Sequence, residues 1–174
     1  MRTVFLSAAA AIVLSHNAHA QQLSATMHVI DQQGIGAPIG EIAITSTSEG
    51  ATFTGTLTGL KSGEHGFHVH ANGDCGPGPN DAGEIVAGGA AGKHWDPVAT
   101  GMHRGPMGDG HLGDLPAFAG PDGTAHIAAT APRITDLNQL RGKALMIHAM
   151  GDNYADEPKP DGGGGTRVAC GIIQ

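Results

Sequence analysis

The sequence predicts an all-β domain. Short segments of alternating apolar and polar residues recur along it, and turn signals separate them about every eight to twelve residues, which is typical of antiparallel sandwiches and barrels. Glycine is abundant, with 29 residues, whereas aromatic residues make up only 3%. The core must therefore consist mainly of Ile, Val, Leu and Ala, and many turns must be glycine turns. Neither an internal repeat nor an interdomain linker is found, which favours one domain over residues 21–174.

The strands are predicted from the alternation and from the turns between them. The turn between the first two strands is expected over residues 31–38, and residues 135–141 could form one or two helical turns capped by Thr135 or Asp136. The segments expected to be strands are residues 23–30, 40–47, 51–58, 66–70, 124–131, 143–150 and 167–173.

Residues 1–20 have the pattern of a secretory signal peptide. Arg2 gives a basic start, Val4 to Leu14 an apolar core, and A-H-A at 18–20 a small-residue cleavage site. The apolar core is too short to span a bilayer, which takes about 20 residues. We therefore expect removal of residues 1–20 and export to the periplasm.

The chain is acidic and has two cysteines. Its formal net charge is −7, and loss of Arg2 would make it one unit more negative. A surface of that charge argues against nucleic acid as a partner, and no later apolar stretch is long enough for a membrane helix. Cys75 and Cys170 both lie in the exported part. An even count in an oxidising compartment favours one disulfide over two unpaired thiols.

Two histidines lie in the predicted strand G-F-H-V-H. Residues on a strand alternate faces, so His68 and His70 project from the same face, about 6.6 Å apart along the chain. Phe67 and Val69 then point the other way, where a core could bury them. Two imidazoles at this spacing can converge on one metal ion, because the ligand bond is about 2 Å and the side chains lean.

Residues 71–121 are rich in Gly and Pro and have no regular period. An irregular loop of this length is unusual in a compact domain, so something other than a β ladder must order it. Three His and one Asp there are the ligand types of a four-coordinate zinc site. With the His of a late strand, the candidates beyond the first pair are His94, His103, His111, Asp114 and His148.

These seven candidates exceed the four ligands of one zinc ion. Imidazole suits zinc and copper alike, whereas a hard cation would want more carboxylates. Either one site has spare ligands, or two metals lie side by side and share one His, whose imidazolate can bridge two ions. The spacing does not say which His would be shared. The other three histidines, His28, His65 and His126, lack such spacing and are interpreted as surface or satisfied core residues.

Several motifs in this order resemble those of copper–zinc superoxide dismutases of the secreted bacterial type. They are G-F-H-V-H, then H-W-D-P, H-R-G-P and G-H-L-G-D-L-P, then M-I-H-A-M-G-D-N, then G-G-G-G-T-R-V-A-C-G-I-I, and they cover essentially the whole mature chain. The resemblance implies an eight-stranded Greek-key barrel or sandwich, immunoglobulin-like in architecture. It also implies a long metal-binding loop and a second active-site loop over residues 151–166.

The resemblance implies a role for individual residues. His94 would bridge the metals, and Asp152 would accept N–H groups from one His of each metal site. Arg167 would be the active-site cation, charged at any relevant pH, and Cys75 and Cys170 would form the intrasubunit disulfide. The implied copper ligands are His68, His70, His94 and His148, and the implied zinc ligands are His94, His103, His111 and Asp114.

The implied reaction converts superoxide to O₂ and H₂O₂ by alternating reduction and reoxidation of a copper ion bridged to zinc through His94. On reduction the bridge to copper is expected to break and His94 to take up a proton. The implied cofactors are one copper and one zinc per subunit, the implied role is antioxidant defence of the cell envelope, and the subunit would be a monomer or a homodimer.

The sequence departs from the family pattern at two positions. Met102 stands where secreted bacterial relatives often have a Lys that helps to attract superoxide, and Lys93 stands where Gly is more usual. Arg104 and Lys93 are nearby candidates to replace this Lys, and the sequence leaves open whether either of them does.

Other protein classes fit only part of this pattern. A non-catalytic copper or zinc carrier would need neither Arg167, Asp152 nor a bridging His. A structural domain of the same fold without metals would lack several ligands, and a copper-only dismutase would lack the His and Asp residues of the zinc site. All of these residues are present, which favours the enzyme.

Overall fold

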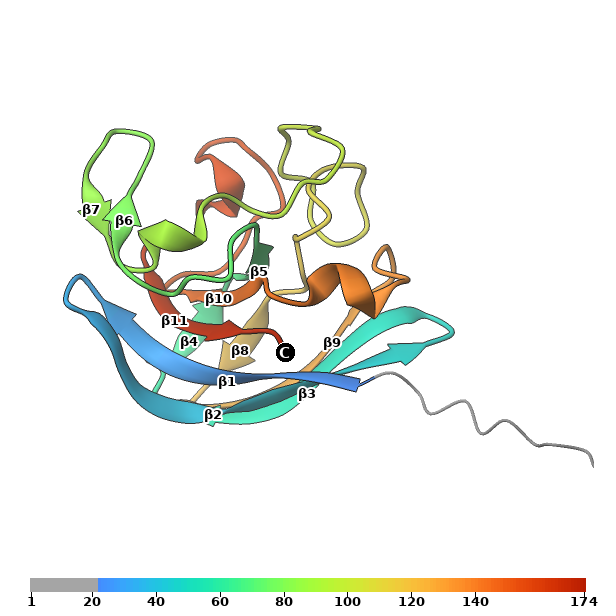
Figure 1. Ribbon diagram of the computed structural model, residues 1–174, viewed down its shortest axis with the longest axis horizontal. Coiled ribbons are helices and arrows are strands. Elements are labelled where there is room, and N and C mark those ends of the chain that lie inside the picture. The colour runs from blue at the N-terminus through green and yellow to red at the C-terminus, as the bar shows by residue number, and fades with distance from the viewer. Residues whose placement is uncertain (1–21) are drawn as a thin grey trace, which may run out of the picture.

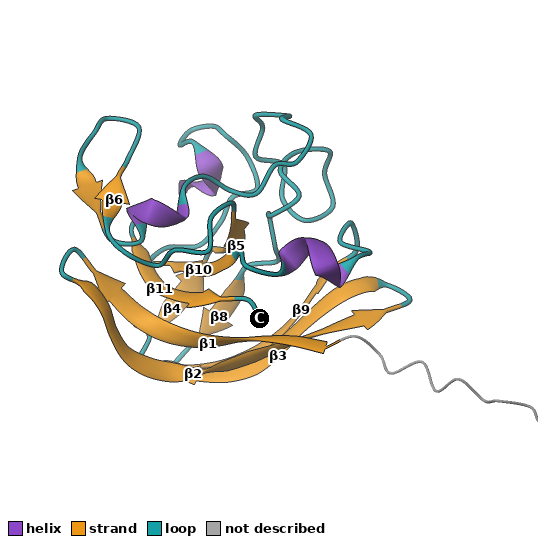
Figure 2. Ribbon diagram, viewed as in Figure 1, coloured by secondary structure: helices purple, strands orange, loops and turns teal. Residues whose placement is uncertain are grey.

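The computed structural model describes residues 22–174, and the predicted signal peptide lies outside the described residues. The described part contains eleven strands and three short 3₁₀ helices, and Figure 2 shows that the helices lie in the connections around the sheet. The fold is therefore all-β, as predicted. The strands are β1 (Gln22–Asp31), β2 (Gly34–Thr47), β3 (Gly50–Thr58), β4 (Gly63–His65), β5 (Phe67–His70), β6 (Gly78–Pro79), β7 (Ile85–Val86), β8 (Phe118–Gly120), β9 (Thr124–Ala131), β10 (Ala144–His148) and β11 (Arg167–Ile172). The helices are η1 (Gly89–Ala91), η2 (Leu137–Leu140) and η3 (Asp161–Gly163).

Seven strands form one curled antiparallel sheet, in the order β5-β10-β11-β1-β2-β3-β9 (Figure 1). The two ends of this sheet are joined by the separate pair β4 and β8. Only Gly66 lies between β4 and β5, and only residues 121–123 lie between β8 and β9. With β4 and β5 counted as one segment, eight strand segments surround the core, as the predicted barrel requires. The pair β6 and β7 forms a small hairpin outside this barrel.

The core fills the inside of the curled sheet and is mainly aliphatic, as the composition predicts. Phe67 and Val69 are fully buried there, which confirms that they face away from the candidate metal ligands. The ring of Phe67 meets those of Phe53 and Phe118 edge to face, at centroid distances of 5.8 and 5.6 Å. Such pairs add about 0.5–1.5 kcal/mol beyond their buried area. The strand that carries the first two histidines is therefore firmly anchored from its other face.

The predicted turn over residues 31–38 is too long. Strand β2 begins at Gly34, and Asp31 pairs directly with it. The Asp31 carboxylate accepts hydrogen bonds from the N–H groups of Gln33 (2.8 Å) and Gly34 (3.0 Å), which closes a tight turn. The register shifts on either side of His28. These irregularities interrupt the alternation of apolar and polar residues from which strands are predicted. The sequence therefore did not predict that β2 begins at Gly34.

The short helix expected over residues 135–141 is present as η2. The Asp136 side chain accepts a hydrogen bond from the N–H of Asn138 (2.9 Å), so Asp136 rather than Thr135 is the N-cap. Leu137 and Leu140 are buried beneath this turn. Tertiary burial and the cap together explain a helix too short to be stable alone.

Two long connections lie on the same side of the barrel, next to β5 and β10 (Figure 1). The first loop is defined here as residues 71–117 and the second loop as residues 149–166. Among the described residues, no helix has the length and apolar character needed to cross a membrane.

The first loop is joined to the sheet by a disulfide between Cys75 and Cys170, whose Cα atoms are 5.7 Å apart. This confirms the predicted pairing. Cys170 lies in β11, and both cysteines are buried in a small apolar cluster with Met146 and Ala144. The loop is therefore covalently attached to the strand that carries Arg167.

Replacing both cysteines with Ser should lower the free energy of unfolding by about 4–5 kcal/mol, because the bond closes a loop with a sequence separation of 95 residues. Urea denaturation of the metal-free protein measures this. A thiol reductant should lower the urea midpoint of the native protein to that of the Cys75→Ser/Cys170→Ser variant. The urea midpoint of the variant should not change. Equal stability of the oxidised protein and the variant would contradict the prediction.

Candidate metal centre

The first two histidines and the last one come from adjacent strands. His68 and His70 lie in β5, which pairs antiparallel with β10, the strand that ends in His148. The ring centroid of His148 is 4.7 Å from that of His68 and 5.7 Å from that of His70. The ladder of β10 with β11 shifts register between Ile147 and His148. Such an irregularity re-aims a side chain, and here the three imidazoles converge.

The first loop is held against the edge of β5 by backbone hydrogen bonds. The N–H of Trp95 donates to the Val69 carbonyl (2.8 Å), and the N–H of Val69 donates to the Gly113 carbonyl (2.8 Å). A Cβ at Gly113 would lie 2.2 Å from the Val69 oxygen, so only glycine allows this approach. The expectation that no β pairing would order this loop was therefore too simple. These contacts place His94 and Asp114 beside His70 and His68, to which isolated bridges join them.

One cluster of four buried histidines lies at the meeting point of β5, β10 and the first loop. Their candidate ligand atoms all lie within 4.8 Å of one another, and the members are His68, His70, His94 and His148. The outer nitrogens of three members donate to fixed acceptors: His68 Nε2 to the Asp152 carboxylate (2.7 Å), His70 Nδ1 to the Gly92 carbonyl (2.9 Å) and His148 Nδ1 to the Gly165 carbonyl (3.2 Å).

These hydrogen bonds decide which nitrogen of each ring carries the lone pair. The inner nitrogens, His68 Nδ1, His70 Nε2 and His148 Nε2, are buried and have no hydrogen-bond partner among the described residues. Unsatisfied buried nitrogens are costly in an empty cavity. A metal ion bound by these three inner nitrogens would accept their lone pairs and remove that cost.

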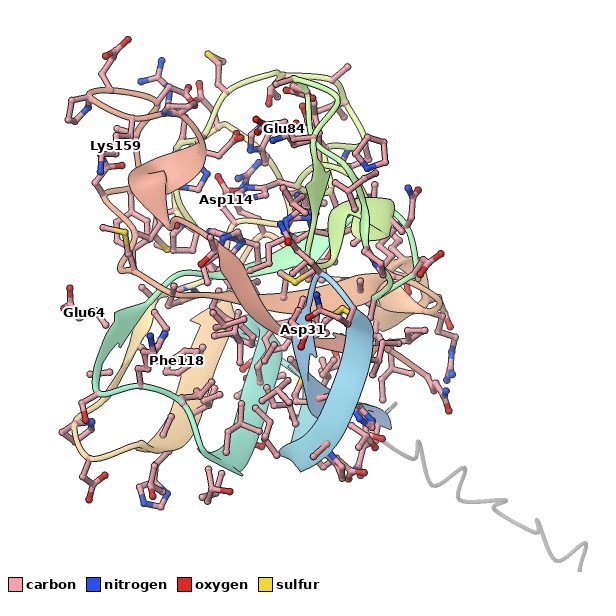
Figure 3. The ribbon with its side chains drawn as sticks, turned by 90° about the vertical axis from the view of Figure 1, so that its left-hand side faces the viewer. Asp31, Glu64, Glu84, Asp114, Phe118 and Lys159 are labelled. Atoms are coloured by element: carbon pink, nitrogen blue, oxygen red, sulfur yellow. A yellow bond between two sulfur atoms is a disulfide. The ribbon has the colours of Figure 1, made fainter. Side chains whose placement is uncertain are left out.

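A second cluster lies wholly within the first loop. Its members are His94, His103, His111 and Asp114, again with candidate ligand atoms within 4.8 Å of one another. The Asp114 carboxylate lies 3.0 Å from His94 Nδ1, 3.1 Å from His103 Nδ1 and 3.4 Å from His111 Nδ1. Its Oδ2 also accepts from the N–H groups of Arg104 and Gly105, each at 3.2 Å. Figure 3 shows Asp114 among the loops, on the far side of the strands from Phe118.

His94 is the one member common to these two clusters of four. Its ring centroid lies 3.9 Å from that of His68 and 5.3 Å from those of His103 and His111. The spacing left open which His two metals would share, and His94 is the histidine that both clusters contain. Because Nδ1 faces Asp114, Nε2 is the nitrogen left for the cluster of four histidines.

Asp152 joins the two clusters from behind. Its Oδ2 lies 2.7 Å from His68 Nε2 and its Oδ1 lies 2.8 Å from His103 Nε2, and the Asp152 side chain is fully buried. One carboxylate therefore orients an imidazole of each cluster, which is the usual task of a carboxylate behind metal-bound histidines. This is the contact that the resemblance implied.

The family model for copper/zinc superoxide dismutase (SODC) matches residues 39–173. The chain belongs to the copper/zinc superoxide dismutase family. It is 47% identical over 171 residues to "Superoxide dismutase [Cu-Zn]" of Escherichia coli (strain K12), covering 98% of each chain. The structure of "Cu/Zn superoxide dismutase from Brucella abortus" has a TM-score of 0.85 at 42% identity, with 88% of this chain and 100% of that one covered. The "Monomeric Copper, Zinc Superoxide Dismutase from Salmonella enterica" has a TM-score of 0.77 at 50% identity, with the same coverage. Membership of the copper/zinc superoxide dismutase family confirms the predicted enzyme class and both predicted metals.

The two clusters differ in their affinity for protons. Burial, helped by the charge of His94, lowers the pKa of His68 to about 3. Burial also holds the pKa values of His70 and His148 well below their usual range. These imidazoles are neutral at pH 7, which is the form that binds a metal.

In the second cluster, which lies within the first loop, the pKa values of His103 and His111 are raised instead of lowered. Burial lowers the pKa of His103, but hydrogen bonds to Asp114 and Asp152 outweigh it and raise that pKa to about 10. A hydrogen bond to Asp114 likewise raises the pKa of His111. Burial opposes ionisation of Asp114, yet its three His partners hold its pKa far below the usual range. Without a metal, a proton occupies the place of the cation between these groups.

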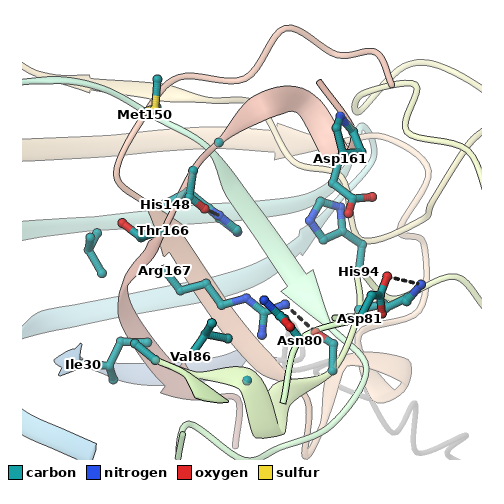
Figure 4. A pocket seen from close by; sticks show the side chains of 18 of the residues that line it. Ile30, Asn80, Asp81, Val86, His94, His148, Met150, Asp161, Thr166 and Arg167 are labelled. Carbon is teal, nitrogen blue, oxygen red and sulfur yellow. Dashed lines mark hydrogen bonds and ion pairs between the residues drawn. The ribbon is translucent and has the colours of Figure 1, made fainter. Parts of the chain in front are cut away.

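An open pocket of about 990 Å³ leads to the clusters, and His94, His148 and Arg167 line it (Figure 4). The Arg167 guanidinium donates to the carbonyl groups of Gly88 (2.6 Å) and Gly92 (2.7 Å) and takes part in no ion pair between described residues. Burial lowers its pKa from a value so high that the group stays charged at neutral pH. A fixed cation therefore faces the same space as two of the candidate copper ligands.

The pocket mouth carries charges that the sequence analysis located only in part. Lys93, one of the two candidate cations, lines the pocket, but its ammonium group is paired with Asp81 at 2.9 Å. Arg104 is exposed and does not line the pocket. Lys159 and Asp161 do line it, and sequence reasoning missed them. The run P-K-P-D before four glycines was visible, but only the fold brings the second loop to the mouth.

The remaining histidines match their interpretation as surface or satisfied core residues. His28 lies 3.1 Å from the Gly36 carbonyl, and His126 lies 3.1 Å from the Thr56 hydroxyl. His65 is buried, and its Nδ1 and Nε2 lie 2.7 Å from the His148 carbonyl oxygen and 2.9 Å from the Lys61 carbonyl oxygen. Its contact with the backbone of His148 supports a candidate ligand, a role that spacing could not show.

The metal-free protein should be most stable near pH 6.5. The pKa of folded His103 is about 10, above its ordinary 6.5, so its stabilising contribution is complete below pH 6.5 and is lost between pH 6.5 and about 10. The pKa of folded His68 is about 3, so its contribution is present above pH 6.5 and is lost as the pH falls from 6.5 towards 3. Urea midpoints measured from pH 5 to pH 10 test both limbs.

Zinc should abolish the alkaline limb, because the bound ion takes the place of the proton on His103. The metal-loaded protein, titrated in parallel, is therefore the control. A metal-free protein that is as stable at pH 9 as at pH 6.5 would contradict the prediction.

Proposed function

We propose that this chain disproportionates superoxide at the centre built around His94. We assign copper to His68, His70, His94 and His148, and zinc to His94, His103, His111 and Asp114. The observation that carries this assignment is the sharing of His94 between two four-residue clusters. In the first of them, three inner nitrogens have no hydrogen-bond partner among the described residues. Three imidazole nitrogens and one carboxylate oxygen suit tetrahedral zinc, and four imidazoles suit copper.

Copper supplies the one-electron redox chemistry, and zinc is redox-inert. Each cycle converts two superoxide ions and two protons into O₂ and H₂O₂. Within this reaction His94 Nε2 is the atom that we assign to hold a proton for the product, because Nδ1 remains against Asp114. Asp152 keeps His68 and His103 in the tautomers that direct Nδ1 of each ring towards the metals.

Arg167 is assigned to bind the superoxide anion. Two carbonyl groups hold its guanidinium in one orientation, so binding costs little side-chain entropy. Its remaining N–H groups can face an anion between it and the copper ligands. A carrier protein would have no need of this cation, which favours catalysis over metal transport.

We further propose that residues 1–20 are a cleaved signal and that residues 21–174 act in the periplasm, as antioxidant defence of the cell envelope. The disulfide between Cys75 and Cys170 supports an oxidising compartment. The subunit is a monomer or a homodimer, and the relative from Salmonella enterica is named as monomeric.

The purified mature protein should dismutate superoxide and contain about one copper and one zinc per chain. Arg167→Gln should lower kcat/KM about 10- to 100-fold, because a charge-assisted hydrogen bond to the anion is lost. The kcat/KM of Arg167→Lys should fall between those of the native protein and Arg167→Gln, since an ammonium group keeps the charge but lacks the paired N–H donors of a guanidinium. Superoxide decay is followed by stopped flow, with metal content determined on the same samples.

Full metal content without activity in the native protein would contradict the proposed function and point to a carrier. Native activity in Arg167→Gln at full metal content would remove only Arg167 from the mechanism. Thr47→Val, which deletes two hydrogen bonds in the distant β2–β3 hairpin, is the matched control and should have native activity.

Charges at the pocket mouth should set the rate at which the anion arrives. Superoxide dismutases as a class work near the diffusional ceiling, and a unit charge about 10 Å away in water contributes about 0.4 kcal/mol. We therefore expect Asp161→Asn to raise kcat/KM about twofold at low salt and Lys159→Gln to lower it by a similar factor. The effects should vanish near 1 M salt, where the Debye length is about 3 Å.

Arg104→Gln is the comparison, because Arg104 does not line the pocket. It should change the rate and its salt dependence less than Lys93→Gln does. An unchanged salt dependence in the double variant of Arg104 and Lys93 would remove both residues from attraction of the substrate.

A further inference from the structure

Tyr154 lies in the second loop, at a point where this loop meets two parts of the first loop. Its backbone has a φ of 55°, in the left-handed region. Bulky residues rarely adopt this conformation, and it persists where the surroundings determine it. Three separate contacts hold Tyr154 in this conformation. Each leads to a residue of the zinc half of the centre, which is the cluster of His94, His103, His111 and Asp114.

The first contact is made by the backbone. The N–H of Tyr154 donates to Oδ1 of Asp152 at 2.7 Å, and the same oxygen lies 2.8 Å from His103 Nε2. The Tyr154 peptide therefore fixes the orientation of the carboxylate that holds an assigned zinc ligand.

The second contact is made by the ring. A Cβ placed on Gly105 would lie 2.7–2.8 Å from three carbon atoms of the Tyr154 side chain, so the ring packs directly on the Gly105 backbone. Gly105 has a φ of 67°, and its N–H donates to Oδ2 of Asp114 at 3.2 Å. The ring thus covers the backbone that bonds to an assigned zinc ligand.

The third contact is made by the hydroxyl group. The N–H of Ala117 donates to the Tyr154 oxygen at 3.0 Å. Ala117 comes three residues after Asp114, whereas Gly105 precedes Asp114 in the chain. Tyr154 therefore holds both chain segments that lead to Asp114.

We propose that Tyr154 is a positioning residue for zinc, which locks the second loop onto the first and slows the loss of the ion. The two contacts of its side chain, with Gly105 and Ala117, lead only to the zinc half. The backbone contact reaches Asp152, which holds His68 as well as His103, and this contact is kept when only the side chain is changed. The inference rests on the proposed assignment of zinc to the cluster of His94, His103, His111 and Asp114.

The test is the rate at which the metal-loaded protein releases zinc to an excess of a chromogenic chelator. Tyr154→Phe keeps the ring and loses one hydrogen bond, so release should become about fivefold faster. Tyr154→Ala loses the ring as well, and release should become about 10- to 100-fold faster, the range found when partners behind metal ligands are removed. The copper absorption spectrum measured before chelation should stay native in both variants.

A double-mutant cycle with Gly105 tests the ring contact itself. Gly105→Ala alone should speed zinc release, because the new Cβ meets the Tyr154 ring and the positive φ is strained. In the Tyr154→Ala background the ring is gone, so the same change should speed release by a smaller factor. Additive effects would overturn the ring contact as the mechanism.

Thr47→Val is again the matched control and should release zinc at the native rate. Native release rates in Tyr154→Phe and Tyr154→Ala would overturn the proposal. So would faster release that merely follows a lower melting temperature of the metal-free variant, because that result indicates general stabilisation. The zinc assignment is tested separately by His111→Asn, which should abolish stoichiometric zinc binding. Full zinc binding by His111→Asn would overturn the assignment instead.

Discussion

Two buried carboxylates are the constraint on which this centre depends. The side chains of Asp114 and Asp152 are fully buried, and an ionised carboxylate away from water is very costly unless it is paired. Each is surrounded by imidazole nitrogens and backbone N–H groups. Asp114 takes its partners from within the first loop, and Asp152 takes His68 from β5 and His103 from the first loop. The charges can stay buried only while these loops keep their positions.

This constraint couples metal binding to the order of the loops. The loops contain little repetitive structure, and their stability comes from the carboxylate pairs, the disulfide and backbone bonds to the edge of β5. Hydrogen bonds to Asp114 and Asp152 raise the pKa of His103, so a proton on His103 stabilises the buried Asp114 carboxylate. A metal ion supplies a larger charge at the same place, so binding free energy becomes loop stability. The rigid barrel beneath, with Phe67 and Val69 in its core, is what allows the loops to be irregular.

Local patterns predicted much of this molecule. The alternation in G-F-H-V-H predicted the directions of four side chains in β5 correctly, and the types and spacing of the candidate ligands predicted the seven residues that the two clusters of four contain. The sequence did not reveal the start of β2, because a register shift beside His28 interrupts the alternation. It also missed Lys159 and Tyr154, whose significance depends on which loops touch. No local period encodes a contact between chain segments about fifty residues apart, such as Tyr154 with Gly105.

The position of Arg167, the proposed substrate-binding cation, relative to the proposed copper ligands follows from a single peptide group. The Gly92 carbonyl accepts one hydrogen bond from Arg167 at 2.7 Å and another from His70 Nδ1 at 2.9 Å. The peptide therefore fixes the guanidinium and an imidazole of the copper cluster against each other. Gly92 has a φ of 74°, in the left-handed region, so the position favours glycine. Because His94 is only two residues further along the chain, the same turn also places the shared ligand. One backbone conformation thus positions Arg167, His70 and His94 relative to one another.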